Sequence, residues 1–235
     1  MPQICCEVPA HSKCSFVSLP LQIPLRKHLF IPLFINMNLI FATANLHKLE
    51  EAQNILNNDV TLVTPAHFGY TKEIPETGNT LEENAMIKAR TIWNALHQNC
   101  FADDTGLEVS ALNGAPGVFS ARYAGLHADM KANMEKLLKE LSPQTDRSAR
   151  FRCVIALIFN GKEFLFEGTV SGTILFEPQG TFGFGYDPLF LPDGYSQPFA
   201  SMLPHEKNAI SHRALALHKL KHFLSTTSLR NCFIT

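Results

Sequence analysis

Two adjacent aspartates, Asp103 and Asp104, are the residues whose type and spacing most directly suggest chemistry. They follow Phe101 and Ala102, which we interpret as a strand end that runs into a tight turn at Gly106. Two neighbouring carboxylates are costly to ionise unless a cation neutralises them. Mg²⁺ suits such a pair, because it takes one or two carboxylates together with water and phosphate oxygens. One carboxylate could also accept a proton from a water; the alternative is one turn-forming and one solvated aspartate.

A further carboxylate, that of Glu76, lies two residues before Gly78 in an expected loop, from which it can reach inward. The following helix is expected to start at Thr80, because Thr80 and Glu83 form a capping box. Glu83 therefore already has a structural task, and we interpret its neighbour Glu82 as solvated. By itself, Glu76 is only a weak indication of a functional site.

The segment between the first expected strand and the next helix carries a hydroxyl, an amide and a lysine. Its residues are Thr43, Ala44, Asn45, Leu46, His47 and Lys48. A strand-to-helix turn points backbone N–H groups and the positive end of the helix dipole outward. The segment is therefore a candidate phosphate-binding loop, although the GxxxxGK[ST] pattern of the P-loop is absent. The alternative is an ordinary capped helix with a solvated Lys48.

Glycines alternate with aromatic residues in the segment Gly180–Pro188. This alternation lets a flat ligand approach the backbone while a ring stacks on it, and in an extended segment it places Phe182 and Phe184 on one side. The segment is not a GxGxxG fingerprint and opens no helix, so a Rossmann site is excluded. The alternative is a strand end that packs both phenylalanines into the core.

Lys207, His212 and Arg213 bring hydrogen-bond donors to the start of the last expected helix. Cations oppose the helix dipole there, which favours, weakly, an anionic or carbonyl-rich ligand as compensation. The alternative is a solvated basic patch. A zinc protease is excluded, because Ala209 stands where the HExxH pattern requires its second histidine.

The hydrophobic pattern predicts the elements that must position these residues. They are a strand over 38–43, a helix around 49–56, a helix from 80 to about 96, a helix over 130–141, strands over 151–159 and 164–170, and a last helix over 210–224. Asn160-Gly161 between the two later strands is a strong hairpin signal. Because helices alternate with strands and one hairpin is antiparallel, we expect an α/β domain with a mixed sheet.

The composition excludes several classes of protein. The chain has 235 residues, of which 46% are hydrophobic and 17% charged, with a net charge of −1. These values suit a globular domain and exclude a disordered or collagen-like chain. The net charge also shows no excess of basic residues of the kind that nucleic-acid binding requires. The six cysteines show no CxxC pair or metal-ligand spacing, so we expect a reduced, intracellular protein without disulfides.

Residues 1–36 contain five prolines and no glycine, and prolines this frequent prevent a regular helix. The basic residues 26–28 before the apolar run 29–35 resemble a signal peptide, but cleavage after Ala44 would destroy the candidate phosphate loop. The apolar run is also too short to span a membrane. We expect an extension over 1–36, with an organelle-targeting role as the alternative, and a folded domain over 37–235.

Five blocks of sequence together resemble the inosine/xanthosine triphosphate pyrophosphatase family, the XTP/dITP diphosphatases. The blocks are TANLHK, EIPETGNTLEENAMIKAR, FADDTGLEVSALNGAPGVFSARYAG, FGFGYDPLF and HEKNAISHRALAL. The resemblance extends from about residue 37 to about residue 223. The chain departs from the commoner family wording at Ala44, where glycine is frequent, and at Thr105, where serine is frequent; Ala44 narrows the backbone freedom of the loop.

The resemblance implies a long, twisted, mixed β-sheet with flanking helices and two lobes around a central cleft. It also implies a homodimer that uses Mg²⁺ to hydrolyse deaminated purine nucleoside triphosphates (ITP, dITP and XTP) to the monophosphate and pyrophosphate. A cytoplasmic enzyme that cleanses the nucleotide pool, without a nucleic-acid or membrane partner, is the expectation. The alternatives are a Maf-type pyrophosphatase for other modified nucleotides and a nucleotide-binding module without turnover.

The resemblance further implies a role for each site residue. Glu76 and Asp104 would bind Mg²⁺ with support from Asp103, and Asp104 would accept a proton from the attacking water. Phe184 would stack on the base. The substrate-binding residues would be Thr43, Ala44, Asn45, Leu46, His47 and Lys48 at the triphosphate, Thr105 beside it, and Phe184, Gly185, Tyr186, Asp187, Lys207, His212 and Arg213 around the base and sugar.

Overall fold

The computed structural model describes residues 37–56, 60–125 and 129–231. The expected extension over 1–36, with its signal-peptide-like pattern, lies outside the described residues. Within the described ranges, no helix is both long and apolar enough to cross a bilayer. The two cysteines in these ranges, Cys100 and Cys153, are buried free thiols.

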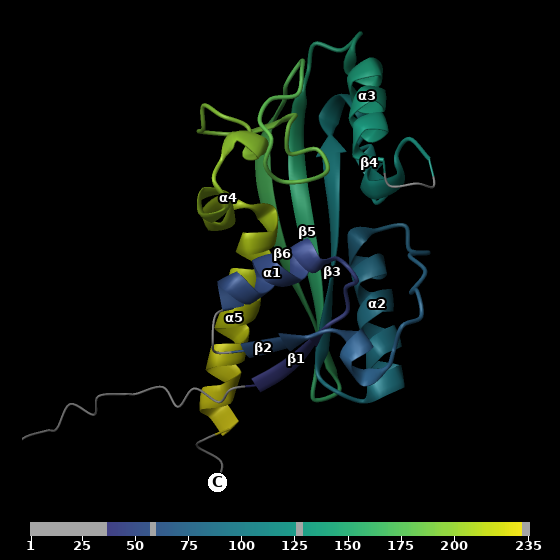
Figure 1. The fold of residues 1–235 in the computed structure, drawn as a ribbon, viewed down its shortest axis with the longest axis vertical. Coiled ribbons are helices and arrows are strands. Elements are labelled where there is room, and N and C mark those ends of the chain that lie inside the picture. Colours follow the sequence, from purple (N-terminus) through teal and green to yellow (C-terminus); the bar gives the residue numbers. More distant parts are fainter. Residues whose placement is uncertain (1–36, 57–59, 126–128, 232–235) are drawn as a thin grey trace, which may run out of the picture. The chain divides into compact units, whose positions relative to one another are not determined.

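The described strands form one mixed sheet in the order β2-β1-β3-β5-β6-β7, with the short β4 paired to β3 (Figure 1). The strands are β1 (Met37–Phe41), β2 (Val60–Val63), β3 (Cys100–Val109), β4 (Pro116–Gly117), β5 (Ser148–Phe159), β6 (Lys162–Ile174) and β7 (Phe190–Pro192). β1 is parallel to β2 and β3, and the other neighbours are antiparallel. The expected mixed sheet is therefore confirmed.

The turn at Asn160-Gly161 joins β5 to β6, as the sequence indicated. Its φ angles are 51° and 73°, the left-handed values that a two-residue hairpin turn of type I′ needs. The turn sets the register in which Phe159 pairs with Lys162. Both strands are longer than expected, because pairing continues outward from the turn to Ser148 and Thr173.

Five α-helices accompany the sheet in the described part of the chain. They are α1 (Leu46–Leu56), α2 (Leu81–Leu96), α3 (Met130–Leu141), α4 (Pro204–Ile210) and α5 (His212–Asn231). The expected cap of α2 is confirmed, because the Thr80 side chain accepts a hydrogen bond from the Glu83 amide. The expected single last helix is wrong: Ser211 is extended, with ψ of 153°, so α4 ends before it and α5 begins after it.

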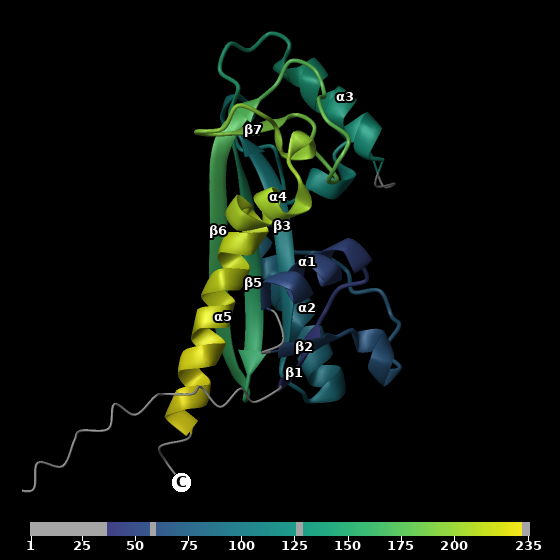
Figure 2. The same cartoon turned by 60° about the vertical axis from the view of Figure 1, so that its left-hand side comes forward.

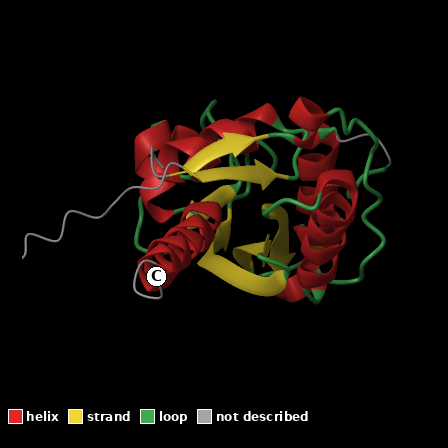
Figure 3. Ribbon diagram, turned by 90° about the horizontal axis from the view of Figure 1, so that it is seen from below, coloured by secondary structure: helices red, strands yellow, loops and turns green. Residues whose placement is uncertain are grey.

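Side chains of β3 and β5 alternate between two apolar layers, as the two-residue period of a strand requires. Phe101 and Ile155 face α1 and α5 on one side of the sheet. Ala102 and Val154 face α2 on the other side. Figure 2 shows α5 running along β6, and Figure 3 shows strands between α5 and the helices opposite. The first half of β3 is thus covered on both faces.

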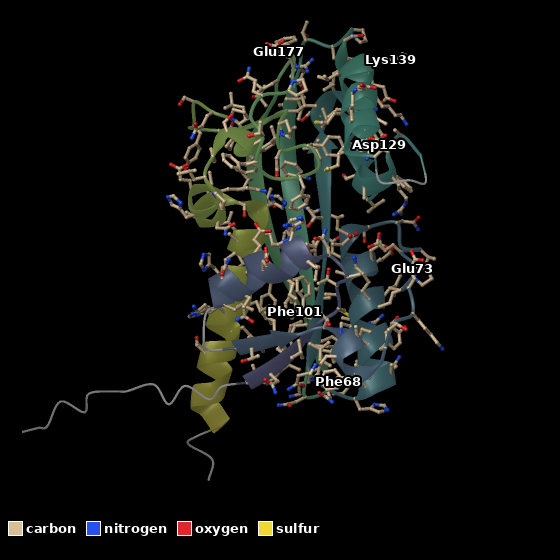
Figure 4. The ribbon with its side chains drawn as sticks, in the orientation of Figure 1. Phe68, Glu73, Phe101, Asp129, Lys139 and Glu177 are labelled. Carbon is tan, nitrogen blue, oxygen red and sulfur yellow. The ribbon has the colours of Figure 1, made fainter. Side chains whose placement is uncertain are left out.

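A third apolar cluster fills the other end of the long strands. It joins Leu107 of β3 and Phe151 of β5 to Leu137 of α3 and to Phe190 and Phe199. Figure 4 shows Phe101 in the interior of the opposite end, while Asp129 and Lys139 lie at α3. β3 therefore runs from one core to the other, in agreement with the two expected lobes.

The expectation that Asp103 and Asp104 lie on a tight turn at a strand end is wrong. β3 continues without interruption to Val109 and pairs with β5 along its whole length. Successive side chains of a strand leave opposite faces. The two carboxylates therefore point to different sides of the sheet, in the stretch between the two cores.

Candidate active site

Asp103 and Asp104 lie where β3 has no strand partner on one edge among the described residues. β3 pairs with β1 at Cys100 and Phe101, and with β4 at Leu107 and Glu108. Among the described residues, those between these two pairings have a strand partner only on the β5 side. Side chains from both faces of the sheet are therefore able to reach the space beside this unpaired edge of β3.

Asp103 lies between two cations on the α5 side of the sheet. Lys48 Nζ is 2.9 Å from its Oδ1, and Arg213 Nε is 3.1 Å from its Oδ2. Burial raises the pKa of Asp103, but Lys48, Arg213 and Lys88 outweigh this effect and hold the pKa well below its usual range. Asp103 is therefore a permanent anion that holds Lys48 and Arg213 in place.

Arg213 is itself held by neighbouring side chains. Its Nη1 is 2.5 Å from Glu51 Oε2, and its Nη2 donates to Thr105 Oγ1 over 3.4 Å. The guanidinium carbon lies 5.5 Å from the centre of the Phe184 ring. The structure thus brings Thr105, Phe184 and Arg213 together, as expected, but each of the three Arg213 nitrogens donates to a protein partner.

Asp104 belongs to a second cluster on the α2 side. Lys88 Nζ lies 3.2 Å from Asp104 Oδ1 and 2.6 Å from Glu76 Oε1, and Arg122 Nη1 lies 3.3 Å from Glu76 Oε2. The other oxygen of Asp104, Oδ2, is buried and has no hydrogen-bond partner among the described residues. Lys88 therefore joins the two carboxylates that come from separate segments.

The surroundings shift the pKa values of the two carboxylates in this cluster in opposite directions. Burial raises the pKa of Asp104, and repulsion by Glu76 and Asp103 adds to this effect against the attraction of Lys88. Burial also raises the pKa of Glu76, but attraction and hydrogen bonding by Lys88 outweigh it, so the Glu76 pKa is lowered. Asp104 is therefore the more basic of the two.

The expected phosphate loop forms the start of α1. Asn45 Oδ1 accepts hydrogen bonds from the amides of His47 and Lys48 at 3.0 and 3.2 Å, and the Asn45 amide donates to Thr43 Oγ1. The Asn45 side chain is therefore a helix cap, as the alternative interpretation had it. The other half of that alternative, a solvated Lys48, is wrong, because Lys48 reaches Asp103.

One cavity of about 660 Å³ joins these parts. Its lining includes the start of α1 with Lys48, and also Glu76, Lys88 and Asp103. A further side is formed by the segment 64–66 and the segment 70–74. The candidate phosphate loop therefore faces the same space as Glu76, Lys88 and Asp103.

Asp187 organises the glycine-rich loop. Its Oδ2 accepts hydrogen bonds from Lys207 Nζ at 2.7 Å and from the Phe184 amide at 2.8 Å. The Lys207 ammonium also lies 5.0 Å from the centre of the Phe184 ring. Burial raises the pKa of Asp187 against the attraction of Lys207. Phe184 is only partly buried and Phe182 is exposed, so the alternative with both rings in the core is wrong.

His212 and Tyr186 were also expected around the base and sugar, and both contact the protein interior. The His212 ring stacks on Phe151 at 4.6 Å, and its buried Nδ1 has no hydrogen-bond partner in the described part. Burial lowers the pKa of His212, as do the charges of Arg213 and Lys207, so the ring is neutral. The Tyr186 hydroxyl donates to the Ser120 carbonyl, and its ring belongs to the third apolar cluster, so its side chain points away from the loop surface.

Several placements correct the expectations from the sequence. Lys207, His212 and Arg213 are all buried, so a solvated basic patch is excluded. Glu82, expected in solvent, is partly exposed and also pairs with Arg152 at 2.7 Å. The Gly185 amide lies against the sulfur of Met130 at 3.0 Å.

Lys88 is the functional candidate that our reasoning from the sequence missed. It lies on the same helix face as Leu81, Ala85 and Ile92, which are buried apolar residues of α2. A lysine at such a position is a signal, because lysine is rarely buried unless it is paired. Arg122 and Glu51 carried no comparable signal, since their partners come from distant segments.

Two carboxylates in this site have the chemistry of magnesium ligands. In the described ranges, no three or more His, Cys, Asp or Glu side chains gather closely enough to form a metal cage. Mg²⁺ does not need such a cage, because it binds one or two carboxylates together with water and substrate phosphates. Glu76 and Asp104 fit this requirement, as two carboxylates that Lys88 holds side by side.

Comparison with known proteins places this geometry in a family. The sequence model of the Ham1 family matches residues 39–223. A dITP/XTP pyrophosphatase of Christiangramia forsetii is 49% identical over 189 residues, which are 80% of this chain and 100% of the relative. A dITP/XTP pyrophosphatase of Porphyromonas gingivalis is 51% identical over 187 residues, covering 79% of this chain and 96% of the relative.

Solved structures agree with the sequence comparison. A Ham1 protein from Staphylococcus aureus superimposes with a TM-score of 0.76 at 39% identity, covering 81% of this chain and 99% of that one. A Ham1 protein from Coxiella burnetii has the same TM-score at 41% identity, with the same coverage of both chains. From the family match, the identities and the shared fold together, it follows that this chain belongs to the Ham1 family.

Proposed function

We propose that this protein hydrolyses deaminated purine nucleoside triphosphates (ITP, dITP and XTP) to the monophosphate and pyrophosphate, with Mg²⁺ as cofactor. The observation that carries the proposal is the link through Lys88, which holds Glu76 and Asp104 together beside the α1 phosphate loop. The names of the relatives, dITP/XTP pyrophosphatases, support the same reaction.

The start of α1 and two lysines would receive the triphosphate. A helix N-terminus favours an anion through its dipole and its backbone N–H groups. Lys48 and Lys88 line the same cavity and bring positive charge to the phosphate oxygens. Because each is already held by a carboxylate, neither lysine needs to be ordered when the substrate arrives. This preorganisation favours binding.

Asp104 would act as the general base. Its Oδ2 is buried and accepts no hydrogen bond from the described residues, and burial raises the pKa of the group, which makes it a better proton acceptor. The water oxygen would form a bond to the α-phosphorus while the bond to the oxygen bridging toward the β-phosphorus breaks. The proton of the water would pass to Asp104, and pyrophosphate would leave beside Lys48.

Glu76 and Asp104 would hold Mg²⁺. When bound, the ion would neutralise the negative charge that develops on the phosphate oxygens. The lowered pKa of Glu76 keeps this carboxylate ionised, as a ligand must be. Asp103 would contribute indirectly, because it anchors Lys48.

Phe184 and Lys207 would meet the base. The Phe184 ring offers a stacking surface, and Lys207 beside it is a buried donor oriented by Asp187. A 6-oxo purine presents an acceptor where adenine presents a donor. A buried donor left without an acceptor costs about 1–3 kcal/mol, so a site of this kind discriminates against ATP.

A homodimer in the cytoplasm completes the proposal. A cytoplasmic location would suit an enzyme that removes deaminated nucleotides from the free nucleotide pool. Light scattering coupled to size-exclusion chromatography measures the assembly directly. A mass of twice 26.2 kDa is expected, and a monomer at micromolar concentration would contradict it.

The test of the function is pyrophosphate release by the full chain with ITP, dITP, XTP, ATP and dTTP, each with Mg²⁺ and with excess EDTA. We expect turnover of the three deaminated substrates at least tenfold above ATP and dTTP, abolished by EDTA. A preference for dTTP would support a Maf-type activity instead. Tight binding of ITP without turnover would show a nucleotide-binding module. Either result contradicts the proposal.

A further inference from the structure

We propose that Asn84 is a positioning residue that seats the loop carrying Glu76 on the first turns of α2. This role rests on the proposed function, in which the Glu76 carboxylate is part of the active site. Asn84 does not touch the cavity itself, and it acts through the backbone of the loop.

The side chain of Asn84 is completely buried, with 0% of its surface exposed. Its Oδ1 accepts a hydrogen bond from the Gly78 amide at 2.8 Å. The neighbouring Glu83 adds a second bond, since its Oε2 accepts from the Asn79 amide at 2.6 Å. Two consecutive side chains of α2 thus bind two consecutive amides of the loop directly after Glu76.

The loop lies in direct contact with the helix at Gly78. A Cβ at this position would lie 2.6 Å from Glu83 Cβ, 2.8 Å from Asn84 Oδ1 and 3.0 Å from the Asn84 amide nitrogen. Real side chains do not approach this closely, so only glycine permits the seating. Glycine and asparagine are therefore complementary halves of one contact.

Lys88 supplies the other point of attachment. It lies one turn after Asn84 on the same buried face of α2, because residues four apart are neighbours on a helix. Its Nζ binds the Glu76 carboxylate at 2.6 Å while Asn84 binds the backbone two residues further on. One helix face thus fixes both ends of the segment, and with them the position of the carboxylate relative to Asp104.

Only the acceptor half of the Asn84 amide is used for this purpose. Its Nδ2 is buried and has no hydrogen-bond partner in the described part of the chain. Replacement by leucine, which has the same number and branching of side-chain heavy atoms, removes the acceptor and leaves the Gly78 amide unsatisfied. A misplacement of a reacting group by about 1 Å can cost on the order of 100-fold in rate, so we expect the loss in kcat.

The experiment compares Asn84→Leu with Asn99→Leu in the full chain. Asn99 is a matched control, because its Oδ1 likewise accepts a backbone amide, that of Asn160 at 2.7 Å, in the β5–β6 turn. Hydrogen exchange of the Gly78 and Asn79 amides is measured without substrate, and kcat and KM for ITP are measured at several Mg²⁺ concentrations.

We expect Asn84→Leu to accelerate exchange at both amides at least tenfold, to lower kcat at least tenfold, and to raise the Mg²⁺ concentration for half-maximal rate. Asn99→Leu should leave all three within twofold. Unchanged exchange in Asn84→Leu, or an equal loss of kcat in Asn99→Leu, would overturn the proposal. If Asn84→Leu does not fold, Gly78→Ala takes its place, because the added Cβ pushes the loop away from α2 while Asn84 is retained. The same changes in exchange, kcat and Mg²⁺ dependence are then expected, and unchanged exchange would again overturn the proposal.

The exchange measurement separates this role from the proposed function. If the wild-type protein releases no pyrophosphate from any nucleotide, the proposed function is wrong. The exchange rates still report whether Asn84 seats the loop, because they need no substrate.

Discussion

Asp103 and Asp104 are neighbours in the chain, yet they contact different lysines on opposite faces of β3. Asp103 binds Lys48 at 2.9 Å, and Asp104 binds Lys88 at 3.2 Å. The pKa of Asp103 is lowered and that of Asp104 is raised. Titratable groups whose environments push their pKa values apart take different tasks. Here Asp103 anchors cations, and Asp104 remains able to accept a proton.

Replacing Asp104 by asparagine should abolish turnover while nucleotide binding survives. Asparagine keeps the shape of the side chain but cannot take a proton at Oδ2, and the contribution of a general base is about 100- to 10,000-fold. Pyrophosphate release gives kcat, and calorimetry with ITP gives affinity. The exposed Asp193 provides the control Asp193→Asn, which should behave as wild type. Undiminished turnover in Asp104→Asn would remove this residue from the base role.

Replacing Arg213 by alanine should destabilise the fold strongly. The substitution leaves Asp103 and Glu51 without the cation that binds them at 3.1 and 2.5 Å, and breaking a buried pair in this way costs about 3–5 kcal/mol. Urea unfolding measures the loss. The control is Arg90→Ala, which breaks an exposed pair with Glu163 and should cost less than about 1 kcal/mol. Equal losses in the two variants would show that the Arg213 contacts do not stabilise the protein.

Replacing Gly168 by alanine should force β6 and α5 apart. A Cβ at this position would overlap the His212 carbonyl oxygen and lie 2.6 Å from the Ala216 amide nitrogen. Backbone atoms cannot move aside cheaply, and overpacking typically costs about 1–3 kcal/mol or more. Thermal unfolding should show a clear drop in Tm. Ser171→Ala, at an exposed position of the same strand, should leave Tm almost unchanged, and a similar Tm for both variants would contradict the close contact.

The Cys100 thiol should resist alkylation in the native protein. Burial raises its pKa to about 12, and the thiolate, rather than the thiol, is the nucleophile. At pH 8, iodoacetamide should label Cys100 only after denaturation, as peptide mass spectrometry would show. Because the folded pKa lies above the unfolded one, the neutral thiol favours the fold below pH 9, and this contribution disappears as the pH approaches 12. Rapid native labelling would refute the burial.

Local sequence signals predicted many elements correctly. The cap at Thr80, the hairpin turn at Asn160-Gly161 and the helix Met130–Leu141 all appear as expected. Each depends on interactions within a few residues. A cap needs one side chain and one amide three residues on, and a tight hairpin turn needs two residues that tolerate positive φ.

The sequence alone also singled out the carboxylates of Glu76 and Asp103 and the ammonium group of Lys48, which line the cavity, because their chemical types are unusual for a surface loop or a core. It did not say which of them pair. The tertiary structure decided that Asp103 and Asp104 lie within a strand and face apart, since β5, about fifty residues away, continues its hydrogen bonds past both of them. It likewise decided that Lys88 turns inward, because only the folded chain brings Glu76 and Asp104 close enough to stabilise a buried ammonium group. Pairing across such distances depends on the whole packed sheet, and no local pattern contains it.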